Sequence, residues 1–164
     1  MSEIYVVRAF FGNYIRQFIR GGYVAVGWMN NRDLSGIETT EKLTELYTEE
    51  HPEKTNGLVI GQQVGQIERF LWEIKSGDIV ITPEKNSELI YYGIISSRAG
   101  YYYFRGVDGC PYRHRRRVGW VRRIIREKDY SEPFRRTIRS PQVVFHVPKD
   151  KNSIRIYEDE LRFL

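Results

Sequence analysis

The chain has little of the material from which covalent or metal-based sites are built. Cys110 is the only cysteine in 164 residues, which excludes an internal disulfide and a thiolate zinc cluster. His51, His114 and His146 lack the short spacing of metal ligands. No apolar run approaches the roughly 18–20 residues of a membrane span, and the first residues lack a signal-peptide pattern. We therefore expect a cytoplasmic protein without metal, cofactor or membrane partner.

Catalytic motifs are also scarce. No Walker A motif or dinucleotide-binding glycine pattern occurs among the 14 glycines. Glu73 and Lys75 have the E-x-K spacing of metal-dependent nucleases, but they fall at the end of an expected helix and lack an upstream acid. Cys110 and His114 could form a nucleophile–base pair, yet no orienting acid is visible. We expect no catalytic residues and no enzymatic activity, with a small nuclease as an alternative.

Positive charge is concentrated in one segment, Arg98 to Arg139. It holds twelve arginines and one lysine against four acidic residues, whereas the whole chain carries a net charge of only +5. Aromatic residues lie among these arginines. Arginine matches the geometry of phosphate, and aromatic faces stack on bases, so the combination favours a nucleic-acid partner. The aromatic residues are Tyr101, Tyr102, Tyr103, Phe104, Tyr112 and Trp120.

Hydrophobic periodicity predicts a mixed α+β domain. Apolar, β-branched runs predict strands, and apolar residues at helical spacing predict helices. We expect one domain over residues 1–150, with a strongly curved, mostly antiparallel sheet or open β-barrel flanked by helices. Residues 151–164 would pack on it or lead to a further domain. The expected strands are 4–9, 23–28, 79–82, 89–96, 101–104, 113–125 and 142–147, and the expected helices are 14–19, 39–50, 63–75 and 131–138.

A series of motifs follows one another along the chain: YVVRA, VAVGW, QIERFLWEIKSGD followed by IVIT, IYYGIISS, HRRRVGW and DYSEPFRRTIRSPQVVFHV. Their order resembles the EVE/YTH-like branch of the PUA superfamily, and more narrowly the N-terminal reader domains of McrB- and Mrr-like modification-dependent restriction proteins. The resemblance covers residues 4–147 and depends on order and spacing, because no single motif is diagnostic.

This resemblance implies a small curved sheet that binds nucleic acid and flips one base into an aromatic cage. Trp28 follows the second strand, where the cage tryptophan of YTH domains lies. The second wall should come from Tyr101, Tyr102 or Tyr103, of which Tyr102 is favoured; YTH domains have a tryptophan there and this chain has none. Arg8 is a further candidate for the pocket.

Gln62, Gln63 and Gln66 open the central helix and could read a base edge, with Gln66 as the candidate for the pocket, although capping or solvent exposure is the ordinary role of such amides. Side chains alternate along a strand, so Arg113, Arg115 and Arg117 share one face of the basic strand. The other face carries Val118 and Trp120, which we assign to the core. The first face is therefore predicted to contact phosphate, together with the nearby Arg98 and Arg105.

We therefore expect a non-catalytic reader of a methylated base in DNA, which serves a restriction system whose nuclease or AAA+ motor lies elsewhere. An RNA-binding module of the PUA and YTH kind, which reads a modified base in RNA, is the first alternative. A plain protein-interaction domain with an acidic partner is another.

Overall fold

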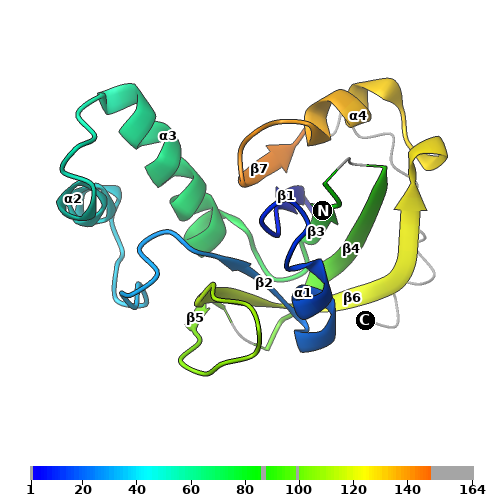
Figure 1. Ribbon diagram of the computed structural model, residues 1–164, viewed down its shortest axis with the longest axis horizontal. Coiled ribbons are helices and arrows are strands. Elements are labelled where there is room, and N and C mark those ends of the chain that lie inside the picture. The colour runs from blue at the N-terminus through cyan, green and yellow to red at the C-terminus, as the bar shows by residue number, and fades with distance from the viewer. Residues whose placement is uncertain (1, 86–87, 99, 149–164) are drawn as a thin grey trace.

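A computed structural model describes residues 2–85, 88–98 and 100–148, so the predictions for residues 151–164 lie outside the described residues. The described chain contains four α-helices and a seven-stranded sheet (Figure 1). In chain order the elements are β1 (Ile4–Val7), α1 (Ile15–Gly21), β2 (Tyr23–Val26), α2 (Thr40–Glu50), α3 (Gly57–Glu68), the π-helical turn η1 (Arg69–Glu73), β3 (Ile79–Pro83), β4 (Leu89–Ile95), β5 (Tyr102–Tyr103), β6 (His114–Arg126), the 3-10 turn η2 (Glu127–Asp129), α4 (Glu132–Ile138) and β7 (Val144–Val147).

The sheet is mixed and open, with the strand order β2-β6-β4-β3-β1-β7 and with β5 also paired to β6. Only the β1–β3 pair is parallel among the described pairings. The α+β class is thus confirmed, and the described pairings are mostly antiparallel. The sheet is open and does not curl into the expected strongly curved sheet or open barrel. The first residues of β6 pair with β2 and β5, and the later ones pair with β4. Figure 1 shows β6 changing direction along its length, so this strand joins the two parts of the sheet.

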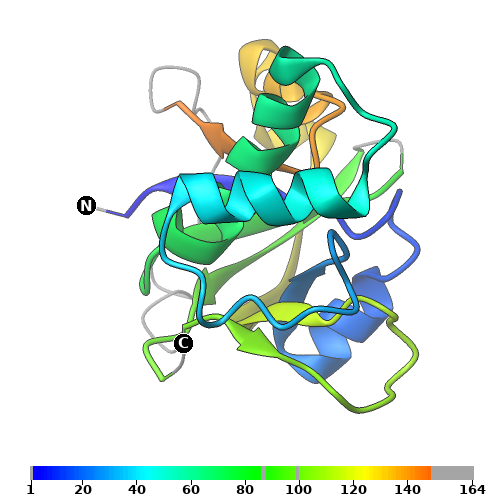
Figure 2. The ribbon, with the colours of Figure 1, turned by 90° about the vertical axis from the view of Figure 1, so that its left-hand side faces the viewer.

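Helices cover both faces of the sheet, which explains why several strands read as continuous apolar runs. In β1, Ile4 and Val6 join a cluster that includes Phe134 of α4. Tyr5 and Val7 point the other way and join the larger cluster formed with α1, α2 and α3. All four residues of β1 are consequently buried. Figures 1 and 2 show α2 and α3 packed together on the side of the molecule opposite α4.

The central helix begins six residues earlier than its periodicity predicts. Three glycines, Gly57, Gly61 and Gly65, weaken the helical signal in this part of the chain. Asn56 nevertheless caps the helix, because its Oδ1 accepts hydrogen bonds from the amides of Leu58 (3.0 Å) and Val59 (3.4 Å). The helix ends in the π-turn η1, which is followed directly by the turn into β3. The other expected elements agree to within a few residues.

Candidate functional site

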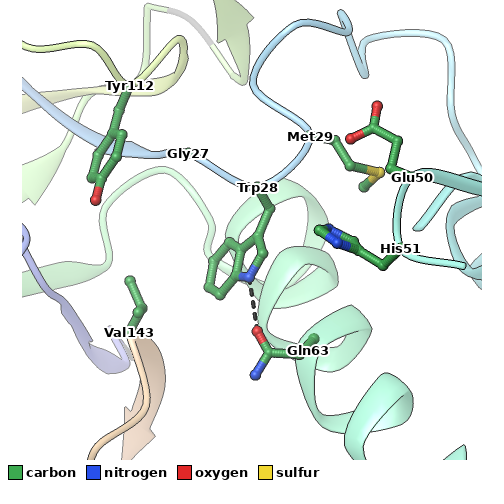
Figure 3. A pocket seen from close by; sticks show the side chains of 8 residues that line it. All are labelled: Gly27, Trp28, Met29, Glu50, His51, Gln63, Tyr112 and Val143. Atoms are coloured by element: carbon green, nitrogen blue, oxygen red, sulfur yellow. Dashed lines mark hydrogen bonds between the residues drawn. The ribbon is translucent and has the colours of Figure 1, made fainter. Parts of the chain in front are cut away.

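A pocket of about 370 Å³ lies beyond the end of β2, where Trp28 follows the strand by two residues (Figure 3). Trp28 is half-buried and packs against the larger hydrophobic cluster. The structure therefore places this sequence-predicted residue in a cavity between β2, α2 and α3. The residues that line the pocket are Gly27, Trp28, Met29, Glu50, His51, Gln63, Tyr112 and Val143.

The indole of Trp28 is fixed by Gln63 of α3. The indole Nε1–H donates to Gln63 Oε1 at 2.8 Å, as the dashed line in Figure 3 shows. An indole N–H can only donate, so this contact fixes which end of the amide faces Trp28. The two hydrogens of Gln63 Nε2 remain as the donors that this side chain can offer elsewhere. A base edge, with its ring-nitrogen and carbonyl acceptors, is one such partner.

Tyr112 forms a second aromatic wall. Its ring lies against Gly27, where an added Cβ would come within 2.6 Å of the ring carbons Cδ1 and Cε1. A side chain at position 27 would therefore displace this ring. The ring also meets Tyr14 edge-on, with centroids 5.2 Å apart and planes at 76°. Burial raises the pKa of Tyr112, so its phenol stays neutral.

The polar part of the pocket comes from the end of α2. His51 caps this helix, and its ring lies 4.6 Å from the ring of Tyr47. The carboxylate of Glu50 pairs with Arg32 at 3.6 Å. The residues that line the pocket thus include two aromatic rings, an amide, an imidazole and a carboxylate, and Figure 3 shows the Gln63 amide and the His51 ring beside Trp28.

The backbone after Trp28 is held in an unusual conformation. Met29 has a φ of 49°, in the left-handed region that β-carbons disfavour. His114 Nε2 donates to the Met29 carbonyl at 3.0 Å, and the backbone amide of Arg113 donates to Asn30 Oδ1 at 2.8 Å. These bonds from β6 and the residue before it hold the turn that presents Trp28.

Tyr101, Tyr102 and Tyr103 do not line the pocket, so the structure does not bring the expected second wall to Trp28. The Tyr101 hydroxyl accepts from the Leu34 amide at 3.0 Å and lies 2.7 Å from His114 Nδ1. The Tyr103 hydroxyl donates to the Asn30 carbonyl at 2.7 Å. These two side chains share a face, as alternation predicts, and they brace the loop that carries Trp28. Tyr102 points away from them and packs under the guanidinium of Arg117, 4.8 Å from the ring centre.

Arg8 and Gln66 also lie outside the pocket. Arg8 donates to the carbonyls of Ile138, Ser140 and Gln142, just beyond and at the end of α4. Cations are favoured at the carboxyl end of a helix, so Arg8 acts as a cap for that segment. Gln66 is buried, and its Oε1 accepts from the amides of residues 143 and 144 at 2.7 and 3.2 Å. Both residues hold β7 in place. Of the three glutamines predicted to read a base edge, Gln63 is the one that lines the pocket.

Arg115 was expected to contact phosphate, and the structure corrects this. Its side chain is 1% exposed and forms a two-pronged ion pair with Asp108, at 2.6 and 3.0 Å. The guanidinium lies between the rings of Tyr23 and Phe104, 4.0 and 3.8 Å from their centres. The alternation argument fails because both faces of the strand are covered at this point. Arg116 is buried too, and it donates to the carbonyls of residues 70 and 74 in and after η1.

The remaining arginines keep a surface position. Arg113 is partly buried and donates to the Phe104 carbonyl at 3.0 Å. Arg105 is exposed and pairs with Asp33 at 3.3 Å. Arg98 and Arg117 are exposed and line a polar groove of about 710 Å³ together with the Gly21-Gly22 turn. This groove lies at the opposite end of β2 from Trp28, because Gly22 immediately precedes that strand.

The groups named in the catalytic alternatives have other partners. Glu73 pairs with Arg69 at 2.9 Å. Cys110 is buried, and both ring nitrogens of His114 are engaged by Tyr101 and the Met29 carbonyl. Among the described residues no group of three or more His, Cys, Asp or Glu is placed to hold a metal ion. Within the same ranges, no helix is long and apolar enough to cross a membrane.

Stability should depend on pH through His114. Burial lowers the pKa of this side chain from its ordinary value of 6.5. Below about pH 6.5 the unfolded chain takes up a proton that the folded chain resists, so the stabilisation is complete above that pH and declines below it. The decline can reach about 1.4 kcal/mol per pH unit. Denaturant unfolding at pH 7.5, 6.5 and 5.5 should show it, and His114→Gln should flatten the slope. An equal slope in both proteins would contradict the buried neutral imidazole.

Comparison with known families gives one match. A family model with the description "Domain of unknown function (DUF8426)" matches residues 12–142. The matched range includes Trp28, Gln63 and Tyr112, and it ends one residue before Val143. No curated protein matches the chain at a significant level.

Proposed function

The chain belongs to the DUF8426 family, and we propose that it is a non-catalytic reader that binds a flipped, modified base of nucleic acid in the Trp28–Tyr112 pocket. The base is a methylated one, and DNA is the proposed carrier. The observation that carries the proposal is a half-buried tryptophan that is fixed by Gln63 and lines the same cavity as a second aromatic residue, Tyr112.

The pocket suits a single flat ring system. Its volume of about 370 Å³ lies at the low end of the roughly 300–1,000 Å³ found for small-molecule sites. Stacking of a base on an aromatic side chain stabilises binding by about 1–3 kcal/mol, which offsets the few kcal/mol lost when a base leaves its stack. Stacking on both Trp28 and Tyr112 therefore outweighs the cost of taking the base out of its stack.

Polar and apolar groups of the pocket match the two parts of a methylated base. The Nε2 hydrogens of Gln63 suit ring-nitrogen or carbonyl acceptors, and the Glu50 carboxylate suits an exocyclic amino hydrogen. Met29 and Val143 add apolar surface that a methyl group can contact. Burial of one methyl group contributes about 0.8 kcal/mol, which corresponds to a preference of about fourfold.

The position of Trp28 in the fold supports the proposed PUA-like relationship. A mostly antiparallel sheet carries Trp28 just after its second strand, where that relationship expects a cage residue. The exposed Arg98 and Arg117 supply charge for phosphates at the other end of β2. We propose that the domain serves a restriction system whose cleaving or motor component is a separate unit.

Matched oligonucleotides test the function directly. Single-stranded and duplex DNA with adenine or N6-methyladenine, and with cytosine or 5-methylcytosine, should be titrated alongside the equivalent RNA. We expect a modified DNA to bind at least about fourfold more tightly than its unmodified match. A preference for modified RNA would favour the RNA-binding alternative. Equal affinity for every oligonucleotide would overturn the reader function, and absence of binding at low salt would favour a protein partner.

The groove arginines should control the salt dependence of binding. Arg117→Ala removes one candidate phosphate contact, so the slope of log K against log salt should fall by about 0.9 for duplex DNA. Affinity should drop for modified and unmodified DNA alike, since phosphates carry no sequence or methylation signal. Titrations between about 50 and 200 mM salt measure the slope. Arg116→Lys is an unsuitable comparison because Arg116 is buried; Arg136→Ala, exposed on α4, is the matched control.

A further inference from the structure

The turn that joins β1 to α1 carries two adjacent exposed phenylalanines. Phe10 and Phe11, between β1 and α1, are 46% and 68% exposed. Isolated exposed apolar residues are common on protein surfaces, but two large neighbouring rings form a feature that needs a reason. The turn is well bonded, since Asn13 N donates to the Phe10 carbonyl at 2.9 Å and Tyr14 N donates to the Ala9 carbonyl at 3.0 Å.

Both phenylalanines are held in a conformation that opposes their side chains. Their φ angles are 50° and 54°, in the left-handed region that costs free energy for residues with a Cβ. Glycine would occupy these positions without strain, and Gly12 does so next to them with a φ of 85°. Backbone strain of this kind clusters at functional sites. We therefore interpret the two exposed rings as part of a binding surface.

The rings are continuous with the pocket wall. Phe11 meets Phe10 edge-on with centroids 5.4 Å apart, and Phe10 stacks on Tyr14 at 5.7 Å with planes at 20°. Tyr14 in turn meets Tyr112, which lines the Trp28 pocket. A row of aromatic side chains thus leads from the cavity to the exposed face of Phe11. A planar apolar partner that extends out of the pocket would meet this row.

The charge around the turn fits a polyanion. Arg16 is exposed in the first turn of α1, which begins directly after the turn. Lys85 is exposed in the β3–β4 connection, and its backbone nitrogen would lie 3.2 Å from a Cβ at Gly12. One acidic residue, Glu84, lies beside it. Flat apolar rings flanked by cations are the combination that binds bases and phosphates of one strand.

We propose that Phe11, supported by Phe10, stacks on the base next to the one held in the Trp28 pocket. The inference rests on the proposed function, since it assigns a place to the neighbouring nucleotide of the same strand. Phe11 is thereby a positioning and affinity residue, while selectivity for the modification belongs to the pocket.

Phe11→Gly tests this role without unfolding the turn. The change removes the ring and also removes the left-handed strain, so the melting temperature should stay the same or rise. Affinity for modified and unmodified oligonucleotides should fall by a similar factor, about 5- to 50-fold, while their ratio stays unchanged. Phe11→Tyr keeps a flat ring and should bind like the parent protein. Val107→Ser, at an apolar residue that is 95% exposed on another loop, is the control and should change nothing.

The outcomes separate this inference from the reader function. If Phe11→Gly binds like the parent while the parent selects modified DNA, the stacking role is wrong and the reader function stands. If the parent binds nucleic acid without selectivity and Phe11→Gly weakens that binding, the stacking surface stands and the pocket assignment fails. If Phe11→Gly changes the ratio between modified and unmodified ligands, Phe11 belongs to the selective site and the inference is overturned. Absence of any binding at low salt overturns both.

Discussion

Arg115→Ala is expected to destabilise the fold by about 3 kcal/mol, because it breaks a buried ion pair. The substitution removes both bonds to Asp108 and the bonds to the carbonyls of Tyr112 and Cys110. It also leaves a space between the rings of Tyr23 and Phe104. Breaking a buried ion pair costs about 3–5 kcal/mol, and the lower end applies because the Asp108 side chain is 30% exposed and can be hydrated.

The same pair can be broken from the other side. Asp108→Ala leaves a guanidinium that is 1% exposed without its counter-charge, so its cost should equal or exceed that of Arg115→Ala. Hydrogen bonds from Arg115 lower the pKa of Asp108, so the stabilisation from this group is complete above the unfolded pKa, near 3.8, and is lost as the pH falls below it. The pH range in which this stabilisation is lost lies well below the range expected for His114.

Arg117→Ala is the matched control for both changes. Arg117 lies two residues along β6 on the same face of the strand, but it is exposed. Substitution of an exposed residue of this kind should change the free energy of unfolding by no more than about 0.5 kcal/mol. Denaturant-induced unfolding compares the three variants. Similar small effects for Arg115 and Arg117 would show that the buried pair does not support the fold.

Trp28→Ala is expected to abolish selectivity for the modified base. Removal of one stacking face lowers affinity by about 1–3 kcal/mol, which corresponds to about 5- to 150-fold. The loss should be larger for the modified ligand, so the ratio between modified and unmodified affinities should approach one. Trp28→Phe keeps a π-face but loses the bond to Gln63, and an intermediate result is expected. Competition binding with the matched oligonucleotides measures each ratio.

Trp72 provides the matched control for Trp28. It is 37% exposed in η1 and does not line the pocket, so Trp72→Ala removes an indole of the same size elsewhere. Its effect on selectivity should be negligible. Gly27→Ala offers a complementary test, because the added Cβ pushes against the Tyr112 ring and moves the opposite wall. A Trp28→Ala protein that retains the parent ratio would contradict the pocket as the site of recognition.

Residues that belong to one regular element were predictable from the sequence. Trp28 follows a clear strand, and Ile67, Phe70, Leu71 and Ile74 form the buried stripe that the helical spacing predicts. The class of the fold follows from the same local periodicities. These signals depend on neighbours within a few positions of each other, which is the range over which a single sequence is informative.

Pairings between distant segments were not predictable. Tyr112 was expected only as one aromatic residue in a basic stretch, and its approach to Gly27 depends on how the chain before β6 returns to β2. Alternation correctly separated Tyr102 from Tyr101 and Tyr103, but it could not say that the latter two face a buried histidine. For Arg115 the alternation rule gave the wrong result. It assumes that one face of the strand is exposed to solvent, whereas Phe104 covers that face at Arg115. Long-range packing decides such positions.

The four-residue pairing of β2 with β6 has a consequence for the size of ligand that can use the whole surface. The pocket and the arginine groove lie at the two ends of β2. At about 3.3 Å per residue, the strand separates them by roughly 13 Å. The paired strands hold the two sites at a fixed distance, because neither end of β2 can approach the other without breaking its hydrogen bonds to β6. A free nucleotide is too short to reach both places, and only a chain of several nucleotides can span them.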